Sequence, residues 1–303
     1  MVESRHFRRN EPPWLLGRKC LAVNLSDIAA MGGRPTGFLL SLGIPSDLPR
    51  GFIDSMLDGL AAAAAEQDVP ILGGDTSGSV SSLFISITIL GAMPRRTAPI
   101  IRSGARPGDG VYVSGALGGS AAGRRLLEAG WTARASGSRR GTIALRAPRG
   151  ARAARPLRAR AMQAVRAHLD PTPRLELGRQ LAGRRLASSA MDISDGLSLD
   201  LARLCAASGV GASVWAHAVP IADAARALAG QLGATPLDLA LNGGEDYELV
   251  FTVPPSREGR LDHSGLDAFC IGRIVRRAAG LRLQDAAGRL TPLRPAGFDH
   301  FRG

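Results

Sequence analysis

The acidic residues of this chain gather in short motifs beside glycine and serine, in a sequence whose charge is otherwise dominated by arginine. Four motifs share this character: Asn24-Leu-Ser-Asp27, Gly73-Gly-Asp75-Thr76, Asp192-Ile-Ser-Asp195-Gly196 and Gly243-Gly-Glu245-Asp246-Tyr-Glu248. Carboxylate oxygens placed in this way suit Mg²⁺, which proteins commonly share with the phosphates of a substrate. A lone aspartate in such a place is more often a helix cap, and Asp195 could cap the helix that follows it. Four acidic motifs in one chain favour the metal interpretation.

A glycine-rich turn over residues 115–123 raises the question of a phosphate site. The turn contains neither GxGxxG nor the P-loop pattern, so neither a dinucleotide-binding fold nor a P-loop is supported. A helix start that faces a phosphate and a simple strand-to-helix turn both remain open, and we favour the second. The five histidines stand in no nucleophile-elbow motif, and the sequence has no HExxH zinc motif. Any nucleotide site must therefore be of another kind.

Hydrophobic patterning and turn residues predict the elements that position these motifs. In the first third of the chain we expect helices over residues 13–31 and 50–67, and strands over residues 37–44, 69–72 and 83–90. A turn cluster from Gly104 to Asp109 is a candidate domain boundary. Beyond it we expect helices over residues 174–181 and 195–208, and strands over residues 111–114, 187–193, 210–219, 247–253 and 268–275. Helices and strands mix without a regular βαβ alternation, which favours two α+β domains.

Length and composition are those of a globular chain of about two domains. The chain has 303 residues, of which 45% are hydrophobic and 21% charged. No apolar run approaches the ~18 residues of a membrane-spanning helix, and the N-terminus has no signal-peptide core, so we expect no membrane association. Three cysteines, Cys20, Cys205 and Cys270, lie far apart without CxxC spacing. They indicate buried thiols in a reducing compartment, and the cytoplasm is the expected location.

The formal net charge of +12 is concentrated in one segment. Residues 129–169 hold ten arginines and no acidic residue, so the rest of the chain carries only +2. Lys19 is the single lysine, and the arginine-rich segment lacks the interleaved aromatic residues that single-strand binding usually requires. We therefore expect a solvated, mobile insertion and no nucleic-acid partner.

Six motifs, in order along the chain, resemble those of the thiamine-monophosphate kinase family. They are Leu21-Ala-Val-Asn-Leu-Ser-Asp-Ile-Ala-Ala-Met-Gly32, Leu72-Gly-Gly-Asp-Thr76, Arg102-Ser-Gly-Ala-Arg-Pro-Gly-Asp109, Met191-Asp-Ile-Ser-Asp-Gly-Leu197, Asn242-Gly-Gly-Glu-Asp-Tyr-Glu-Leu249 and Gly297-Phe-Asp-His-Phe301. The resemblance runs from residue 2 to residue 301, apart from an insertion near residues 131–160. Single motifs of this kind occur by chance, but the ordered set is specific.

The resemblance implies an α+β fold of two domains, the aminoimidazole-ribonucleotide-synthetase-like architecture. Residues 1–104 would form an N-terminal domain that binds ATP and Mg²⁺ and dimerises through its sheet. Residues 105–303 would form a C-terminal α/β sandwich domain that carries the arginine-rich insertion. A homodimer is the expected assembly.

The resemblance also implies the activity: Mg²⁺-dependent transfer of a phosphoryl group from ATP to thiamine monophosphate, directly and in line, to give thiamine diphosphate. The metal ligands in the cleft would be Asp27, Asp75, Asp192 and Asp195. The nucleotide would contact Gly74, Asp75, Arg102 and Ser194, of which Asp75 and Arg102, with Asp195, are the expected catalytic residues. Thiamine monophosphate would contact His6, Glu245 and Phe298. A carboxylate-rich site suits this reaction, because two polyanions must be brought together.

One departure from the family keeps two alternatives open. The family normally has a segment before Val2 that carries a Gly-Asp-Asp motif and a Ser-Thr-Asp motif, and this sequence has neither. The chain could therefore be another ATP-dependent enzyme of the superfamily, or a truncated, non-catalytic dimeric relative. The first is less favoured, because the chain ends in Phe301-Arg-Gly303 where the hydrogenase-maturation relative ends in cysteine, and it lacks the reactive N-terminal cysteine of selenophosphate synthetase.

Overall fold

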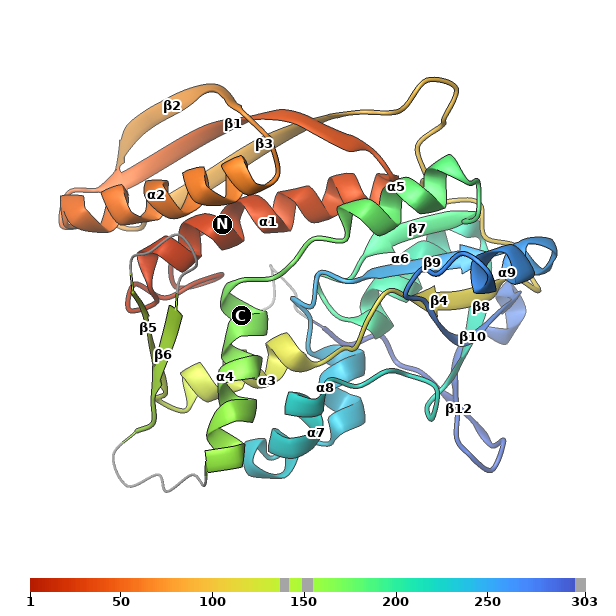
Figure 1. The fold of residues 1–303 in the computed structure, drawn as a ribbon. Helices are drawn as coiled ribbons and strands as arrows, with labels where there is room; N and C mark the ends of the chain where they lie inside the picture. Colours follow the sequence, from red (N-terminus) through yellow and green to blue (C-terminus); the bar gives the residue numbers. More distant parts are fainter. Residues whose placement is uncertain (137–141, 149–154, 298–303) are drawn as a thin grey trace.

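The computed structural model of the chain describes residues 1–136, 142–148 and 155–297. Two sheets of different size dominate it, one from the first third of the chain and one from the rest (Figure 1). This α+β arrangement is the fold class that the sequence predicts. None of the helices in the described ranges is both long and apolar enough to cross a membrane.

The smaller sheet has the strand order β2-β1-β3 and is covered on one face by two helices (Figure 1). Its elements are α1 (Pro13–Met31), β1 (Arg34–Pro45), α2 (Arg50–Glu66), β2 (Ile71–Ser79) and β3 (Phe84–Ala92). Strand β1 pairs with β2 in parallel, across the α2 crossover, and with β3 antiparallel. Alternate residues of β1, among them Phe38 and Leu40, point into the core beneath the helices, while Leu39 between them is exposed.

Helix α1 is placed by its end signals and by two glycines. Proline stands at its first position, and Gly32 ends it in the left-handed conformation with φ of 73°. Where α1 crosses α2, a Cβ atom on Gly17 would lie 1.9 Å from the carbonyl oxygen of Met56, and one on Gly59 would lie 1.9 Å from that of Trp14. Only glycine permits the two backbones to come this close.

The larger sheet has seven strands in the order β12-β11-β8-β10-β4-β9-β7. The strands are β4 (Gly110–Val113), β7 (Ser189–Asp192), β8 (Val210–Trp215), β9 (Leu249–Val253), β10 (Phe269–Arg276), β11 (Leu281–Gln284) and β12 (Leu290–Pro292). One face packs with α6 (Leu197–Ser208) and α8 (Pro236–Asn242), and the other packs with α5 (Leu175–Gly183) and α9 (Pro255–Asp262). Single 3₁₀ turns lie at Ala229–Leu232 and Arg277–Ala279.

A third group of elements contains the arginine-rich segment, and here the expectation of a solvated, mobile insertion is wrong for the described residues. The group comprises α3 (Gly119–Glu128), the hairpin strands β5 (Thr132–Ser136) and β6 (Thr142–Arg146), α4 (Arg155–Leu169) and α7 (Asp223–Leu228). Helix α4 turns Ala161, Ala164, Val165 and His168 inward at helical spacing, and its arginines lie on the other faces. One face of α4 is therefore part of the core.

Helix α1 belongs to all three groups. Leu15 packs in the core of α3 and α4, Leu21 in the core of the smaller sheet, and Ala29 against α5 and the larger sheet. A side chain on α1 can therefore reach residues from distant parts of the sequence.

Candidate functional site

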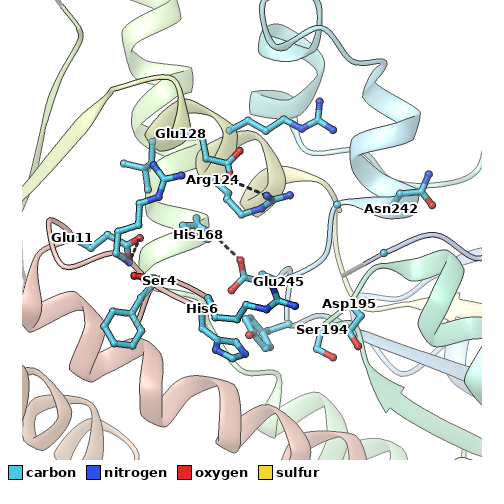
Figure 2. A pocket seen from close by; sticks show the side chains of 18 of the residues that line it. Ser4, His6, Glu11, Arg124, Glu128, His168, Ser194, Asp195, Asn242 and Glu245 are labelled. Carbon is cyan, nitrogen blue, oxygen red and sulfur yellow. Dashed lines mark hydrogen bonds and ion pairs between the residues drawn. The ribbon is translucent and has the colours of Figure 1, made fainter. Parts of the chain in front are cut away.

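One cavity of about 680 Å³ gathers residues from the N-terminal segment, α3, α4, the β7–α6 loop, the α8–β9 loop and the C-terminal segment (Figure 2). It brings together four residues that the sequence singles out, His6, Ser194, Asp195 and Glu245. Gly297 also lines it, and the predicted substrate contact Phe298 lies just outside the described residues. The geometry thus unites motifs that are separated by more than half of the chain.

The β7–α6 loop, which carries Ser194 and Asp195, is organised by Asp200 of the following helix. One oxygen of the Asp200 carboxylate accepts the backbone N–H groups of Ser194, Asp195 and Gly196 at 3.0, 2.9 and 3.2 Å. The capping alternative for Asp195 is wrong, because the N-cap position of α6 is Gly196 and no side chain makes a cap hydrogen bond there. The Asp195 side chain instead forms an ion pair with Arg203, which also donates to Asp200.

The α8–β9 loop holds Glu245 in a strained conformation. Glu245 and Tyr247 have φ of 58° and 51°, in the left-handed region that non-glycine residues avoid. Each such residue costs about 1–3 kcal/mol and persists only where its surroundings enforce it. Here the Glu245 N–H donates to the Ser194 carbonyl at 2.7 Å, and the Tyr247 N–H donates to the Ile193 carbonyl at 2.9 Å. The two cavity loops are thus tied together, and the Glu245 side chain points into the cavity (Figure 2).

The Glu245 carboxylate has two buried nitrogen partners. Lys19 Nζ lies 2.8 Å from Oε1, and His168 Nδ1 lies 3.3 Å from Oε2. Burial is the largest single influence and raises the pKa of Glu245, but the charge and hydrogen bond of Lys19, with His168 and Arg124, together lower that pKa to about 2. Glu245 is therefore a carboxylate, an acceptor of hydrogen bonds, at any physiological pH.

The neighbouring side chain, Asp246, decides between a phosphate site and a simple turn at the glycine-rich residues 115–123. It accepts the backbone N–H of Gly118 at 2.9 Å and that of Ser120 at 3.3 Å, at the start of α3. A side chain of the protein itself therefore occupies the positive end of this helix. The turn is the simple strand-to-helix turn that we favour from the sequence, with an internal carboxyl group as acceptor, whose pKa is raised by burial to about 7.

A second acidic region lies where α1 passes the end of β7. Asp192 is buried there, and burial together with the nearby Asp27 raises its pKa to about 7. Asp27 is exposed, but partial burial raises its pKa, although the positive charge of Arg102 acts to lower it. Two neighbouring carboxylates whose charge is offset only in part, by Arg102 acting on Asp27, fit a divalent ion. Within the described ranges, no three side chains of His, Cys, Asp or Glu lie close enough to hold a metal, so such an ion would need oxygens from a substrate as well.

Asp75 and Gly74 lie elsewhere, on the smaller sheet. Strand β2 runs from Ile71 to Ser79, so both residues stand in mid-strand and not, as expected, in a loop after it. Asp75 is exposed and accepts a hydrogen bond from Ser77 Oγ at 3.0 Å. A Cβ atom on Gly74 would lie 1.8 Å from the Leu40 carbonyl oxygen, so close packing against β1 explains why glycine stands at this position. The structure does not bring all four predicted ligands, Asp27, Asp75, Asp192 and Asp195, into one metal-binding group, and their assignment as ligands stays a prediction.

Sequence reasoning missed four residues that hold Glu245 and the β7–α6 loop in place. Lys19, His168, Asp200 and Arg203 carry no motif of their own. For Lys19 a signal was present, since a single lysine in an apolar stretch of a chain rich in arginine is unusual. For His168 the helical spacing of buried residues in α4 was the only sign, and the arginines around it obscured that pattern.

Comparison with known proteins gives matches along nearly the whole chain. The family described as AIR synthase related protein, N-terminal domain, matches residues 1–93, and its C-terminal counterpart matches residues 106–283. Thiamine-monophosphate kinase from Escherichia coli (strain K12) is 37% identical over 306 residues, which cover 99% of this chain and 84% of the relative. The enzyme of the same name from Rhodopirellula baltica is 35% identical over 287 residues, covering 94% of this chain and 76% of the relative.

A solved structure bears the name "AaThiL complexed with AMPPCP and TMP". It superposes on this chain with a TM-score of 0.81 at 31% sequence identity, and the match covers 99% of this chain and 85% of that one.

Proposed function

The chain belongs to the thiamine-monophosphate kinase family, and on this premise we propose that it converts thiamine monophosphate and ATP to thiamine diphosphate and ADP. An oxygen of the substrate's phosphate forms a bond to the γ-phosphorus of ATP. The bond from that phosphorus to the β,γ-bridging oxygen breaks, and its electron pair leaves with ADP. A phosphate monoester has a second pKa of about 6, so the acceptor is already a nucleophile at neutral pH and needs no general base.

The observation that carries this proposal is the cavity that unites His6, Ser194 and Glu245 with the C-terminal Gly297. Thiamine is a cation with an amino-substituted ring, and the ionised Glu245 is a suitable partner for both features. Arginines on the same cavity, Arg8 and Arg124 among them, suit the phosphate of the substrate. We propose that His6, Glu245 and Phe298 bind thiamine monophosphate.

Mg²⁺ is the cofactor that we propose, and Asp27 and Asp192 are the residues that would hold it, as the raised pKa of both supports. When bound, the ion supplies neutralisation of the phosphate charge, so that two polyanions can approach. The part played by the chain itself is to keep two carboxylates close together at the junction of α1 and β7, next to Arg102. We propose Asp75 and Asp195 as further metal ligands; in the structure Asp75 accepts a hydrogen bond from Ser77 and Asp195 forms an ion pair with Arg203.

Nucleotide contacts are proposed on the same basis for Gly74, Asp75, Arg102 and Ser194. Of these, Ser194 lines the cavity and Arg102 acts electrostatically on Asp27. The catalytic role proposed for Arg102 is to offset negative charge on the transferred phosphoryl group, and Asp75 and Asp195 would act on that group through the Mg²⁺ that they would hold.

A homodimer is supported by the uncovered face of the smaller sheet. Large apolar side chains are exposed on its strands, including Leu39, Leu72 and Leu90. An apolar sheet face of this kind is typical of a surface that a second copy covers. Sedimentation of the purified chain tests this proposal, and a monomer at micromolar concentration would reject it.

The remaining proposals concern domains and location. We propose a division into residues 1–104 and 105–303, which is compatible with sheets that end at Ala92 and begin at Gly110. A reducing compartment, the cytoplasm, is supported by three cysteines that are free in the structure.

The test of the proposed function is an assay of the 303-residue chain with thiamine monophosphate, ATP and Mg²⁺, in which thiamine diphosphate and ADP are quantified by chromatography. Equal amounts of the two products are expected. Release of inorganic phosphate without thiamine diphosphate would contradict the proposal, since it would make the chain an ATPase. Glu245→Gln is the matched variant, and a raised KM for thiamine monophosphate with little change in the KM for ATP is the expected result.

A further inference from the structure

Lys19 is the single lysine of a chain that otherwise carries its positive side-chain charge on arginine. Its side chain is 1% exposed on α1, although lysine is almost never fully buried without a partner. Its ammonium lies 2.8 Å from Glu245 Oε1, across 226 positions of sequence. The two charges compensate one another's burial, and the pair joins the first helix to the α8–β9 loop.

His168 completes the support of Glu245 from α4. It is 3% exposed, and burial, with help from the charge of Lys19, lowers its pKa to about 3, so the ring is neutral. Its Nδ1 lies 3.3 Å from Glu245 Oε2 and 3.1 Å from Ser120 Oγ. An ionised carboxylate only accepts hydrogen bonds, so the contact is favourable in the tautomer with the proton on Nδ1. Each carboxylate oxygen of Glu245 thus has one fixed neighbour.

The Glu245 carboxylate keeps acceptor capacity for a ligand. A carboxylate has about four lone-pair sites, and the two neighbours use two of them. The Glu245 side chain is 24% exposed and lines the cavity together with His168 (Figure 2), whereas Lys19 is 1% exposed and does not line it. The backbone conformation of Glu245, with φ of 58°, directs its side chain toward the cavity.

We propose that Lys19 is a positioning residue for substrate recognition: it fixes the Glu245 carboxylate as the acceptor of the amino group on an amino-substituted heteroaromatic cation. The inference rests on the proposed function, which supplies thiamine monophosphate as that cation. A charge-assisted hydrogen bond from the amino group is stronger and more selective when the acceptor is ionised and held in one orientation. Lys19 provides both conditions without contacting the substrate.

Two further charged side chains face this group. Arg124 of α3 acts on both Glu245 and His168, and Glu11 of the N-terminal segment lies near Lys19. Glu11 Oε2 has no hydrogen-bond partner within the described ranges, and burial raises the pKa of Glu11. Glu11 is therefore a weaker competitor for the lysine than Glu245, and the Lys19–Glu245 pair dominates.

The first test compares Lys19→Met with the wild-type chain on two substrates, thiamine monophosphate and its analogue with a 4′-oxo group in place of the amino group. The wild type should prefer the amino substrate in kcat/KM by about a hundredfold or more, since a site that is built to bind an N–H group rejects an analogue without it. In Lys19→Met, KM for thiamine monophosphate should rise at least tenfold and the preference should fall at least tenfold. The KM for ATP should change less than twofold. An unchanged preference would overturn the proposal, because a merely structural lysine would leave selectivity intact.

A neighbouring arginine offers a matched control. Arg18 lies on the same helix and joins Glu66 and Asp170 at 2.9 and 2.8 Å, away from the cavity lining. Arg18→Met removes two ion pairs between elements distant in sequence and should leave the substrate preference unchanged. In a double-mutant cycle, Lys19→Met should add little to Glu245→Gln, and fully additive effects on selectivity would also overturn the proposal.

A second measurement uses the wild-type chain alone, in case Lys19→Met does not fold. Labelling of lysine with ¹⁵N at Nζ gives one side-chain signal, because the chain has one lysine. This signal should be protected from solvent exchange and should shift on addition of thiamine monophosphate, but not on addition of a non-hydrolysable ATP analogue. No shift at saturating thiamine monophosphate would overturn the proposal. If the signal shifts but no thiamine diphosphate forms, the proposed function fails and this inference stands. If thiamine diphosphate forms but the signal does not move and the selectivity of Lys19→Met is unchanged, this inference fails and the proposed function stands.

Discussion

The two acidic regions of the molecule treat their carboxylates in opposite ways. Glu245 is matched by a buried ammonium and a neutral imidazole, and its pKa falls to about 2. Asp192 meets a second carboxylate, Asp27, and its pKa rises to about 7. Both regions are linked by the same helix, which contributes Lys19 to the first and Asp27 to the second.

The contrast separates a site whose charges are compensated within the chain from a site whose charges are not. Around Glu245 the charges balance within the chain, so the carboxylate can be held rigid before any ligand arrives, which lowers the cost of binding. Around Asp192 the charges do not balance, and the region gains stability only when a cation enters or a proton binds. We interpret the first region as the site that recognises the organic substrate and the second as the site where a cation neutralises the charge of the phosphates.

The largest effect that would sharpen this contrast is loss of activity in Asp192→Asn. We expect kcat to fall about a thousandfold, because several kcal/mol of transition-state stabilisation are lost and ~1.4 kcal/mol is a factor of ten. The folded state should not become less stable, since the variant removes a buried carboxylate that lacks a counter-charge. Initial rates and a thermal melt at pH 8 measure both quantities.

Asp285→Asn is the control for this substitution. Asp285 lies in the β11–β12 turn and accepts hydrogen bonds from the backbone N–H groups of Ala287 and Arg289. The same change of chemistry there should leave kcat within a factor of two. Near wild-type activity in Asp192→Asn would mean that the buried carboxylate is only a structural group.

In contrast to Asp192→Asn, Glu245→Gln should cause a large loss of stability. Removal of one partner of a buried ion pair costs about 3–5 kcal/mol, because the other charge stays behind. Here Lys19 would be left buried without a carboxylate at 2.8 Å. Denaturant titration at pH 7.5 should place Glu245→Gln well below wild type and below Asp192→Asn. If the two variants are equally stable, the contrast between the regions is wrong.

The sequence predicts the fold better than the electrostatic environment of the site. Helix α1 was expected over residues 13–31 because proline and glycine mark its ends, and the structure agrees. Strand β2 was expected to stop at Leu72, where apolar alternation ends, but backbone pairing with β1 carries it on to Ser79. Glu245 was found from its motif, whereas Lys19, 226 positions earlier, could not be paired with it without tertiary structure. Local patterns encode elements, and long-range pairing decides which carboxylates are compensated.

A smaller effect is expected from the cation itself. Mg²⁺ with a non-hydrolysable ATP analogue should stabilise the wild type by about 2.7 kcal/mol at a concentration one hundred times Kd. The gain should be lost in Asp27→Asn and on addition of EDTA, but Glu245→Gln should keep it, since its substitution lies in the other region. Thermal shift with each variant measures this. An equal gain in Asp27→Asn would remove Asp27 from the cation site.

The smallest effect is a difference in pH dependence between the two regions. His168 has a pKa of about 3 in the fold against 6.5 ordinarily, so below pH 6.5 the unfolded chain takes up a proton that the folded chain does not, and stability falls as pH falls. Asp192 has a pKa of about 7 against 3.8, so between these values the folded chain holds the extra proton and stability rises as pH falls. Each slope is about 1.4 kcal/mol per pH unit at most, and the two oppose one another in the wild type.

Substitution of one partner at a time should therefore separate the two slopes. Between pH 6.5 and about 5.5, above the ordinary pKa of 4.5 of Glu245, His168→Gln should gain stability relative to wild type as pH falls, and Asp192→Asn should lose it. Gln can still donate to the Glu245 carboxylate but carries no titrating group, so the hydrogen bond and the proton are tested separately. Denaturant midpoints at half-unit steps of pH give the difference curves, in which all other titrating groups cancel. Parallel curves for His168→Gln and wild type would show that His168 is protonated in the fold, and Glu245 would then be held by two cations instead of one.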